Sequence, residues 1–200
     1  MNAKNLRSIA SVALVGVAAW IGYSQKPVGP SKPKLDVAIK PQHVADALRA
    51  VITSQREVYT RLYSRLPATP ERTRSTDSST RASKPISSPC EVLRLCSEAV
   101  ASKGVEFSFV LRSRRPIDKR NLPETDVEKK GLELAVERPD SSHSAEELLG
   151  GRWYYTAVYP DIGTDQTCVD CHNQLQPNSK TKLKLGDVFG SLVIRIALEL

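Results

Sequence analysis

Two cysteines and a histidine within residues 167–173 constrain what this chain can fold into more than any other feature. They are arranged as Cys168-x-x-Cys171-His172, which is the attachment sequence of a c-type haem. Two thiols three positions apart can each add to one of the two vinyl groups at a haem edge, and the adjacent imidazole then serves as the proximal ligand of the iron. The pattern therefore predicts one covalent haem c, with Cys168 and Cys171 as thioether donors and His172 as iron ligand.

Other interpretations of the two cysteines are a disulfide, half of a zinc site and a thioredoxin-like redox pair. A zinc site needs further ligands, which Cys90, Cys96 or His143 could supply, but the spacing of Cys90 and Cys96 is unlike a zinc knuckle. His143 also falls in a segment expected to be a polar loop. A redox pair opens a long helix, whereas Pro177 ends any helix here early. The residues favour haem attachment.

The N-terminus fits the compartment in which haem c is attached. Lys4 and Arg7 precede a charge-free apolar stretch at 9–22, which is shorter than the ~20 residues of a membrane span. A small-x-small sequence at 22–24 is a candidate cleavage site, so residues 1–24 are predicted to be a secretory signal. An uncleaved membrane anchor is the alternative. In either case we expect the domain to be periplasmic, free or anchored.

Composition narrows the classes of partner. The 200 residues, 40% of them hydrophobic, suffice for one domain with a core. The formal net charge of +7 is modest and falls largely in expected loops, which indicates a solvated surface or attraction to an acidic redox partner. Nucleic-acid binding is not expected, because the sequence offers no basic helix and no set of stacking aromatic residues, and the expected compartment does not hold nucleic acid.

Hydrophobic spacing predicts the order of elements. A Pro- and Lys-rich linker over 25–40 leads into a domain over 41–200, which opens with a long amphipathic helix at 42–66 that could also pair with a second copy in a homodimer. A Ser-, Thr- and Arg-rich insert around 68–89 is expected to be disordered. Further helices are predicted over 90–102 and 124–137, strands over 105–112, 152–159 and 187–198, and one or two helical turns at the motif. This order indicates an α+β fold with an antiparallel sheet flanked by helices.

The distal ligand of the iron stays open. Met1 is the only methionine, so the usual His/Met pair of an electron-carrying cytochrome is excluded. Cys96, Tyr59 and His43 are candidate ligands, and a vacant position is a further alternative. For the two remaining cysteines the favoured interpretation is that Cys96 is a small buried side chain and Cys90 a surface thiol.

A basic run follows the first predicted strand. Such a run is usually a solvated face, but the two carboxylates of a haem need partners, and arginine binds a carboxylate through two parallel hydrogen bonds. Arg112 and Arg115 are therefore candidate partners of the haem propionates.

Several segments resemble the Tll0287-like haem-binding domain family. The segments are Tyr159-Pro160-Asp161, Cys168-Val169-Asp170-Cys171-His172-Asn173, Pro177-Asn178-Ser179-Lys180 and Leu185-Gly186-Asp187-Val188-Phe189-Gly190, with Val58-Tyr59-Thr60, Phe107-Ser108-Phe109 and 115–123 upstream. The resemblance covers roughly residues 42–198. It implies a PAS-like fold, with a central antiparallel sheet flanked by helices, that holds one covalent haem outside the cytoplasm and senses a redox state or a small ligand.

The residues and the resemblance together lead to one expectation. We expect a periplasmic monohaem c-type protein that senses a redox state or a small diatomic ligand, and the alternative is a periplasmic electron-transfer cytochrome. An enzyme is not expected, because the sequence offers neither a second haem motif nor a clear distal acid–base pair.

Overall fold

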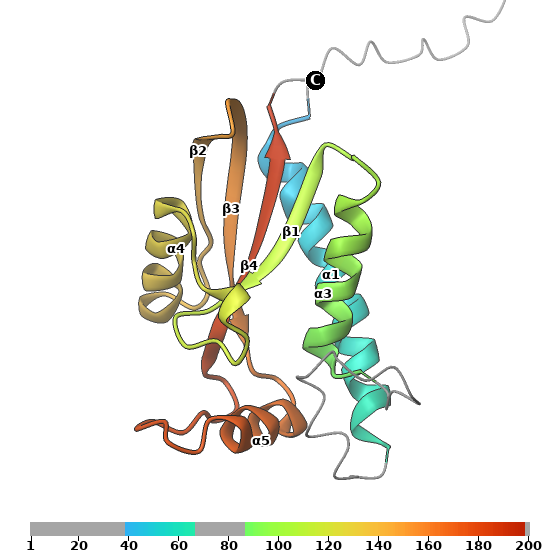
Figure 1. Ribbon diagram of the computed structural model, residues 1–200, viewed down its shortest axis with the longest axis vertical. Helices are drawn as coiled ribbons and strands as arrows, with labels where there is room; N and C mark the ends of the chain where they lie inside the picture. The colour runs from blue at the N-terminus through green and yellow to red at the C-terminus, as the bar shows by residue number, and fades with distance from the viewer. Residues whose placement is uncertain (1–38, 67–86, 199–200) are drawn as a thin grey trace, which may run out of the picture. The chain divides into compact units, whose positions relative to one another are not determined.

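A four-stranded antiparallel sheet with helices on both faces organises the chain (Figure 1). The computed structural model describes residues 39–66 and 87–198. The predicted signal or anchor lies outside these residues, as do the linker up to residue 38 and the insert up to residue 86. Within the described residues, no helix combines the length and the apolar character that a membrane crossing requires.

The elements alternate between helix and strand, as the predicted order indicates. They are α1 (Pro41–Ser64), α3 (Pro89–Ala101), β1 (Phe107–Arg112), a 3-10 turn (Lys119–Asn121), α4 (Asp126–Glu137), β2 (His143–Leu149), β3 (Arg152–Ile162), α5 (Gln166–Leu175) and β4 (Val188–Ala197). The strands run in the order β1-β4-β3-β2, and each pair is antiparallel. The prediction of an α+β fold with an antiparallel sheet is confirmed.

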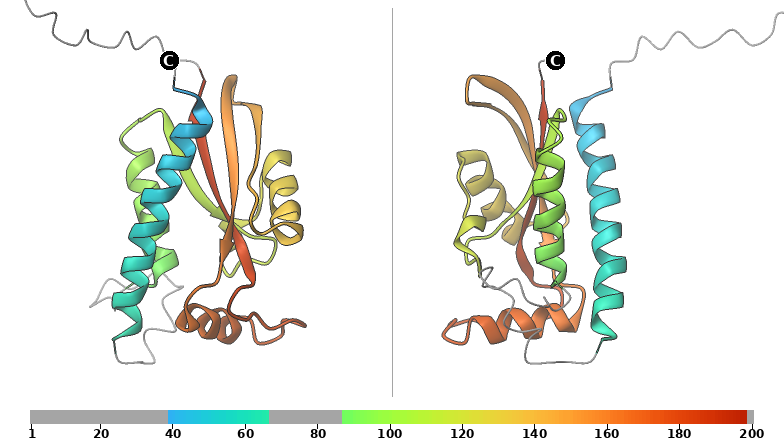
Figure 2. Two further views of the ribbon diagram at one scale, coloured as in Figure 1. Left: turned by 180° about the vertical axis from the view of Figure 1, so that it is seen from behind. Right: turned by 45° about the vertical axis from the view of Figure 1, so that its right-hand side comes forward.

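One face of the sheet carries the hydrophobic core under α1 and α3 (Figure 2). Side chains alternate along a strand, so every second residue of β4 points to this face. The buried members of the core are Ala45, Ile52, Leu93, Phe109, Ala157, Tyr159, Leu192, Ile194 and Ile196. The outer side of α1 stays open, with Val51, Val58 and Leu62 about half exposed. A homodimer through this helix stays a prediction.

The other face is covered by α4, and charged side chains fill the space between them. Glu128, on the first turn of α4, is fully buried. Its Oε1 accepts hydrogen bonds from Arg112 Nε at 3.0 Å and from Arg195 Nη2 at 2.5 Å. Burial acts to raise the pKa of Glu128, but a hydrogen bond from the Glu124 N–H and the two guanidinium charges outweigh it and lower the pKa below its usual range. Glu128 is therefore ionised at neutral pH.

Helix α4 packs directly against β3 at Gly131. A Cβ at this position would lie 2.5 Å from Val158 Cβ, a separation that real Cβ atoms essentially never show. Alanine normally stabilises a helix interior relative to glycine by ~1 kcal/mol. We expect Gly131→Ala to lower the free energy of unfolding instead, by about 1–3 kcal/mol, because the added methyl overpacks the contact.

Urea denaturation of the two proteins measures this change. Lys130→Ala, at an exposed position on the same helix, is the matched control and should change the free energy of unfolding by less than about 0.5 kcal/mol. A Gly131→Ala variant more stable than the parent would show that α4 can move away from the sheet.

Two segments differ from the prediction. The residues around His143, expected to form a polar loop, begin β2, whose half-buried positions include Glu147 rather than only apolar residues. Strand β3 continues beyond Pro160, its predicted end, to Ile162. Opposite β2 the register of β3 ends at Val158, so Pro160 lies where one side of β3 is open and a residue without an N–H is tolerated.

Candidate functional site

The cysteine–histidine motif lies on α5, a helix at one end of the sheet. Asp165 caps this helix, and its carboxylate accepts a hydrogen bond from the Thr167 N–H at 2.8 Å. The helix runs ten residues, longer than the one or two turns predicted. It ends before Pro177, as predicted.

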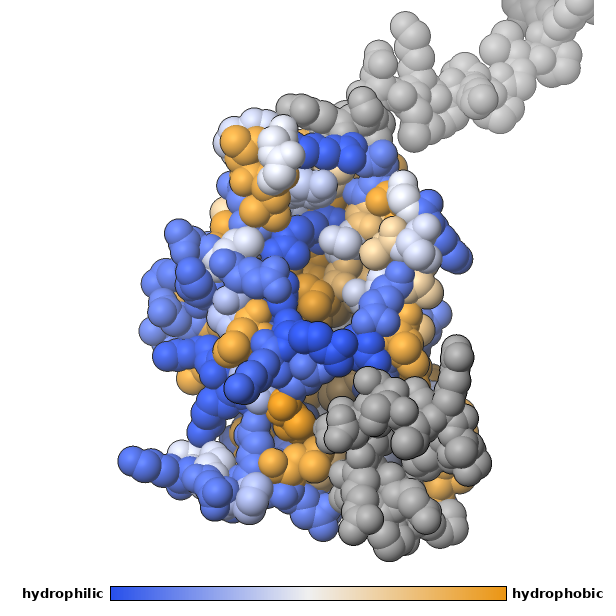
Figure 3. Space-filling model, in the orientation of Figure 1, coloured by the Kyte–Doolittle hydropathy of each residue, from blue (hydrophilic) through white to orange (hydrophobic). Residues whose placement is uncertain are grey.

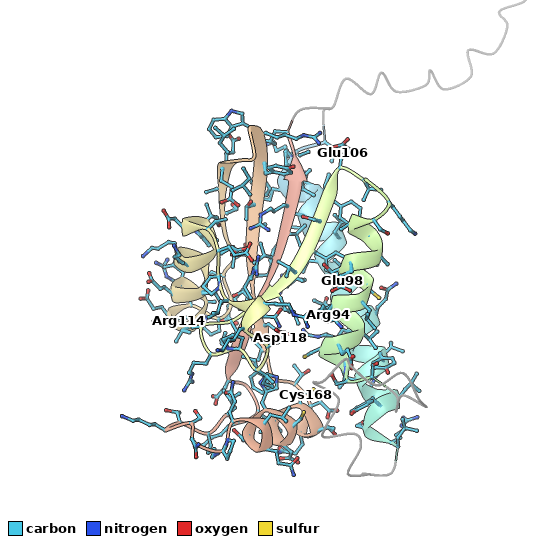
Figure 4. The ribbon with its side chains drawn as sticks, in the orientation of Figure 1. Arg94, Glu98, Glu106, Arg114, Asp118 and Cys168 are labelled. Carbon is cyan, nitrogen blue, oxygen red and sulfur yellow. The ribbon has the colours of Figure 1, made fainter. Side chains whose placement is uncertain are left out.

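The three motif side chains share one side of α5. Spacings of three and four residues place Cys168, Cys171 and His172 on neighbouring positions of a helix, and all three are half-buried. The opposite side is exposed and carries a hydrogen bond from Gln166 Nε2 to Asp170 Oδ1 at 2.7 Å. Cys168 lies on the side of α5 toward the rest of the domain (Figure 4).

An aromatic ring supports the histidine. Phe189, at the start of β4, lies with its ring centroid 4.8 Å from that of His172, with the planes tilted by 52°. Phe189 fits there because position 163 is glycine, since a Cβ on Gly163 would lie 2.4 Å from the Phe189 ring. Burial lowers the pKa of His172, the Asp161 carboxylate raises it, and Arg56 lowers it further, with a net decrease. At neutral pH His172 is thus the neutral imidazole that binds metals.

An ion pair joins α1 to this end of the sheet. Arg56, on α1, binds Asp161, near the end of β3, and their side chains are only 20% and 15% exposed. The charges of both residues act on His172 and on Cys168. The pair therefore lies beside the motif.

A third cysteine also lies there. Cys90 is the second residue of α3, directly after Pro89. Burial raises the pKa of Cys90 to about 12, and Asp161, Cys168 and Cys171 contribute further. Burial likewise raises the pKa of Cys168 to about 11. Cys90 of α3 therefore lies close enough to the Arg56–Asp161 pair and to the motif cysteines of α5 for their charges to affect its pKa. Sequence spacing could not reveal this, because 78 residues separate Cys90 from Cys168.

The predicted environments of Cys90 and Cys96 are reversed. Cys90, expected at the surface, is half-buried, and Cys96, expected to be buried, is exposed. Six residues turn an α-helix by about 600°, so the two side chains point to different sides of α3. Cys90 lies close enough to the motif cysteines for their charges to affect its pKa, and Cys96 faces solvent.

The other two candidate distal ligands lie on α1. Tyr59 is one turn after Arg56, and its hydroxyl donates a hydrogen bond to the Ser87 carbonyl at 2.7 Å. His43 is 13 residues before Arg56, about 20 Å along the helix, at the end of α1 far from α5 (Figure 2). The structure therefore brings Tyr59 toward the motif and keeps His43 away from it.

The two candidate propionate partners, Arg112 and Arg115, lie in different surroundings. Arg112 is buried against Glu128, and its Nη1 donates to the carbonyls of Arg120 and Leu122 at 2.8 and 3.0 Å. These donors bind groups of the protein, and the role of Arg112 as a propionate partner stays a prediction. Arg115 is exposed and donates to Ser179 Oγ at 3.3 Å, in the loop that follows α5.

The surface around α5 combines apolar and charged groups. Figure 3 shows an apolar patch between the end of the sheet and α5, within a mostly hydrophilic face. Ile162, Val188 and Phe189, at the ends of β3 and β4, are half-buried.

A metal site made of protein side chains alone is a separate question. In residues 39–66 and 87–198, no three or more His, Cys, Asp and Glu side chains are grouped so that they could hold a metal ion.

Fold and site together define an α+β domain with a C-x-x-C-H helix at one end of an antiparallel sheet. The chain belongs to the Tll0287-like family, whose model matches residues 5–197. Among solved structures it is similar to the crystal structure of the cyanobacterial heme-protein Tll0287, with a TM-score of 0.44 and 9% sequence identity over 79% of this chain and 96% of that chain. No curated protein matches the sequence. The family match confirms the resemblance seen in the sequence.

Proposed function

We propose that this chain is a periplasmic monohaem c-type protein that senses a redox state or a small ligand. The observation that carries the proposal is the common half-buried side of α5 on which Cys168, Cys171 and His172 lie. The family to which the chain belongs and the heme-protein that it resembles support haem as the cofactor. The predicted secretory signal or anchor supports the location, and the antiparallel sheet flanked by helices agrees with a PAS-like fold.

The residues present fit a haem. Two thiols provide the covalent links, the neutral imidazole of His172 provides the proximal ligand, and Phe189 fixes the ring of that histidine. The apolar patch beside α5 suits an apolar macrocycle (Figure 3). When bound, the haem iron supplies one-electron chemistry and a position for a further ligand.

Cys90 is the side chain that best fits the distal position. It is half-buried, comes from a different helix, and lies close enough to Cys168 and Cys171 for their charges to affect its pKa. Exposed Cys96 and distant His43 do not meet these conditions. Tyr59 is the alternative, although its hydroxyl already donates to Ser87.

This placement of Cys90 also supports a second function, electron transfer. A protein ligand that stays on the iron in both oxidation states leaves no position for a diatomic molecule. If Cys90 stays bound, the protein would respond to the redox state alone or pass electrons to a partner.

An absorption spectrum of protein exported in a host with the c-type maturation system tests the proposal. Pyridine haemochrome analysis should find one covalent haem per chain. Rapid CO binding to the reduced protein would support ligand sensing, and a six-coordinate spectrum unaffected by CO would support redox sensing or electron transfer. A colourless protein, with zinc or with a Cys168–Cys171 disulfide, would contradict the proposal.

The variant Cys90→Ala refines this test. If Cys90 is the distal ligand, the variant should change the spectrum and bind CO faster than the parent protein. The matched control Cys96→Ala, at the exposed cysteine of the same helix, should leave both unchanged.

A further inference from the structure

We propose that the Arg56–Asp161 pair sets the reduction potential of the haem. This inference rests on the proposed haem site and concerns two residues that bind neither the iron nor the thioether bridges. They are tuning residues, which act on the iron through their charges.

The position of the pair follows from the fold. Asp161 lies four residues before Asp165, the cap of α5. The register between β3 and β4 shifts between Asp161 and Ile162, and such an irregularity changes the direction of the side chains. Arg56 reaches this point from α1, 105 residues away in sequence. The segment that leads into α5 therefore carries one charge, and the helix packed against the sheet supplies the other.

Partial burial strengthens the electrostatic effect of Arg56 and Asp161 on their surroundings. An interaction between charges near a protein surface is about four times stronger than in bulk water, because the effective dielectric constant falls from about 80 to about 20. Salt also screens partly buried charges less than exposed ones. The geometry places the pair beside the motif. Asp161 is two residues before Gly163, which packs against the Phe189 ring, and the centroid of that ring lies 4.8 Å from the centroid of the His172 ring. The effect of both charges on the pKa values of His172 and Cys168 agrees with this placement.

The two charges have opposite effects on the iron. Oxidation of ferrous to ferric iron removes one electron and adds one positive charge to the site. The Asp161 carboxylate favours the ferric state and the Arg56 guanidinium favours the ferrous state. In the intact pair these effects partly cancel, so removal of either partner exposes the effect of the other.

A redox titration of the holo-protein with dithionite and mediators tests the inference. At the midpoint potential of the parent protein, Asp161→Asn should raise the ratio of reduced to oxidised haem by about tenfold, and Arg56→Gln should lower it by about tenfold. Each change corresponds to about 59 mV for a one-electron couple. The double variant should lie near the parent protein, and Arg56→Lys, which keeps the charge, should stay within about twofold of it.

The exposed pair of Arg152 and Glu106 provides the control. It also joins distant segments, but it involves the first residue of β3, at the other end of the strand from Asp161. Arg152→Gln and Glu106→Gln should leave the ratio within about twofold of that of the parent protein.

The outcomes separate the two proposals. If the parent protein holds one haem but Asp161→Asn and Arg56→Gln shift the ratio in the same direction, or by less than twofold, the pair is structural and the inference is wrong. If the parent protein holds no haem, the proposed function fails and the inference fails with it. Haem content per chain, measured for every variant, shows which case applies.

Discussion

The double variant Cys168→Ala with Cys171→Ala is expected to lose covalent haem completely. Both thioether bonds need these sulfur atoms, and His172 alone can only bind iron reversibly. We expect haem content after acid–acetone extraction to fall from one per chain to none. A haem-stained denaturing gel gives the same information. Because a bound ligand stabilises the folded state, the apo-protein should also melt at a lower temperature and be poorly folded.

Two further variants test whether the loss of haem is specific to the two motif cysteines. Cys96→Ala removes an exposed thiol on α3 and should keep a full complement of haem. Cys168→Ala alone leaves one sulfur and should retain haem through a single link. Haem that stays with the double variant after denaturation would show that another residue forms the link, and an unchanged melting temperature would refute the predicted loss of folding.

The second large effect is expected at Glu128. Glu128→Gln keeps the shape of the side chain but removes the charge that holds Arg112 and Arg195 under α4. Breaking a buried ion pair on one side typically costs about 3–5 kcal/mol, because it leaves buried charge without compensation. We expect a loss of this size in the free energy of unfolding from urea denaturation at neutral pH.

The control and the rescue use the same helix and network. Glu133→Gln, at an exposed position of α4, should change the free energy of unfolding by less than about 0.5 kcal/mol. The quadruple variant Glu128→Leu, Arg112→Met, Arg195→Met and Glu147→Gln should recover most of the stability, since apolar replacement of a buried network is often neutral. Glu147→Gln is included because Glu147 is nearly buried and would otherwise lose its partner Arg195. A cost below about 1 kcal/mol for Glu128→Gln would mean that water reaches the two arginines.

Local patterns were enough to predict most of the elements. The predicted helices over 42–66, 90–102 and 124–137 agree with α1, α3 and α4 to within two residues at each end. Strands β1 and β4 agree equally well, because their apolar residues alternate. Strand β2 was missed because Glu147, on its half-buried side, pairs with Arg195 across the sheet instead of meeting an apolar core.

The surroundings of the motif depend on contacts between distant segments. Cys168, Cys171 and His172 could be identified from their spacing alone. The pairing of Arg56 with Asp161 could not be predicted, since only the packing of α1 against the end of β3 brings the two residues together. The burial of Arg112 could not be predicted for the same reason, because its partner Glu128 comes from a separate helix.

The order of the strands also constrains the path of folding. Strand β4 lies between β1 and β3, and among the strands in residues 39–66 and 87–198 it is the only neighbour of β1. The partner of Phe107 is Ile196, 89 residues later, so the pairing of β1 with β4 carries the entropic cost of closing a long loop. In the proposed export of the chain from its N-terminus, the motif would become available before the central strand does. A maturation enzyme would therefore meet Cys168 and Cys171 on a chain whose sheet is still incomplete, when both thiols are most accessible.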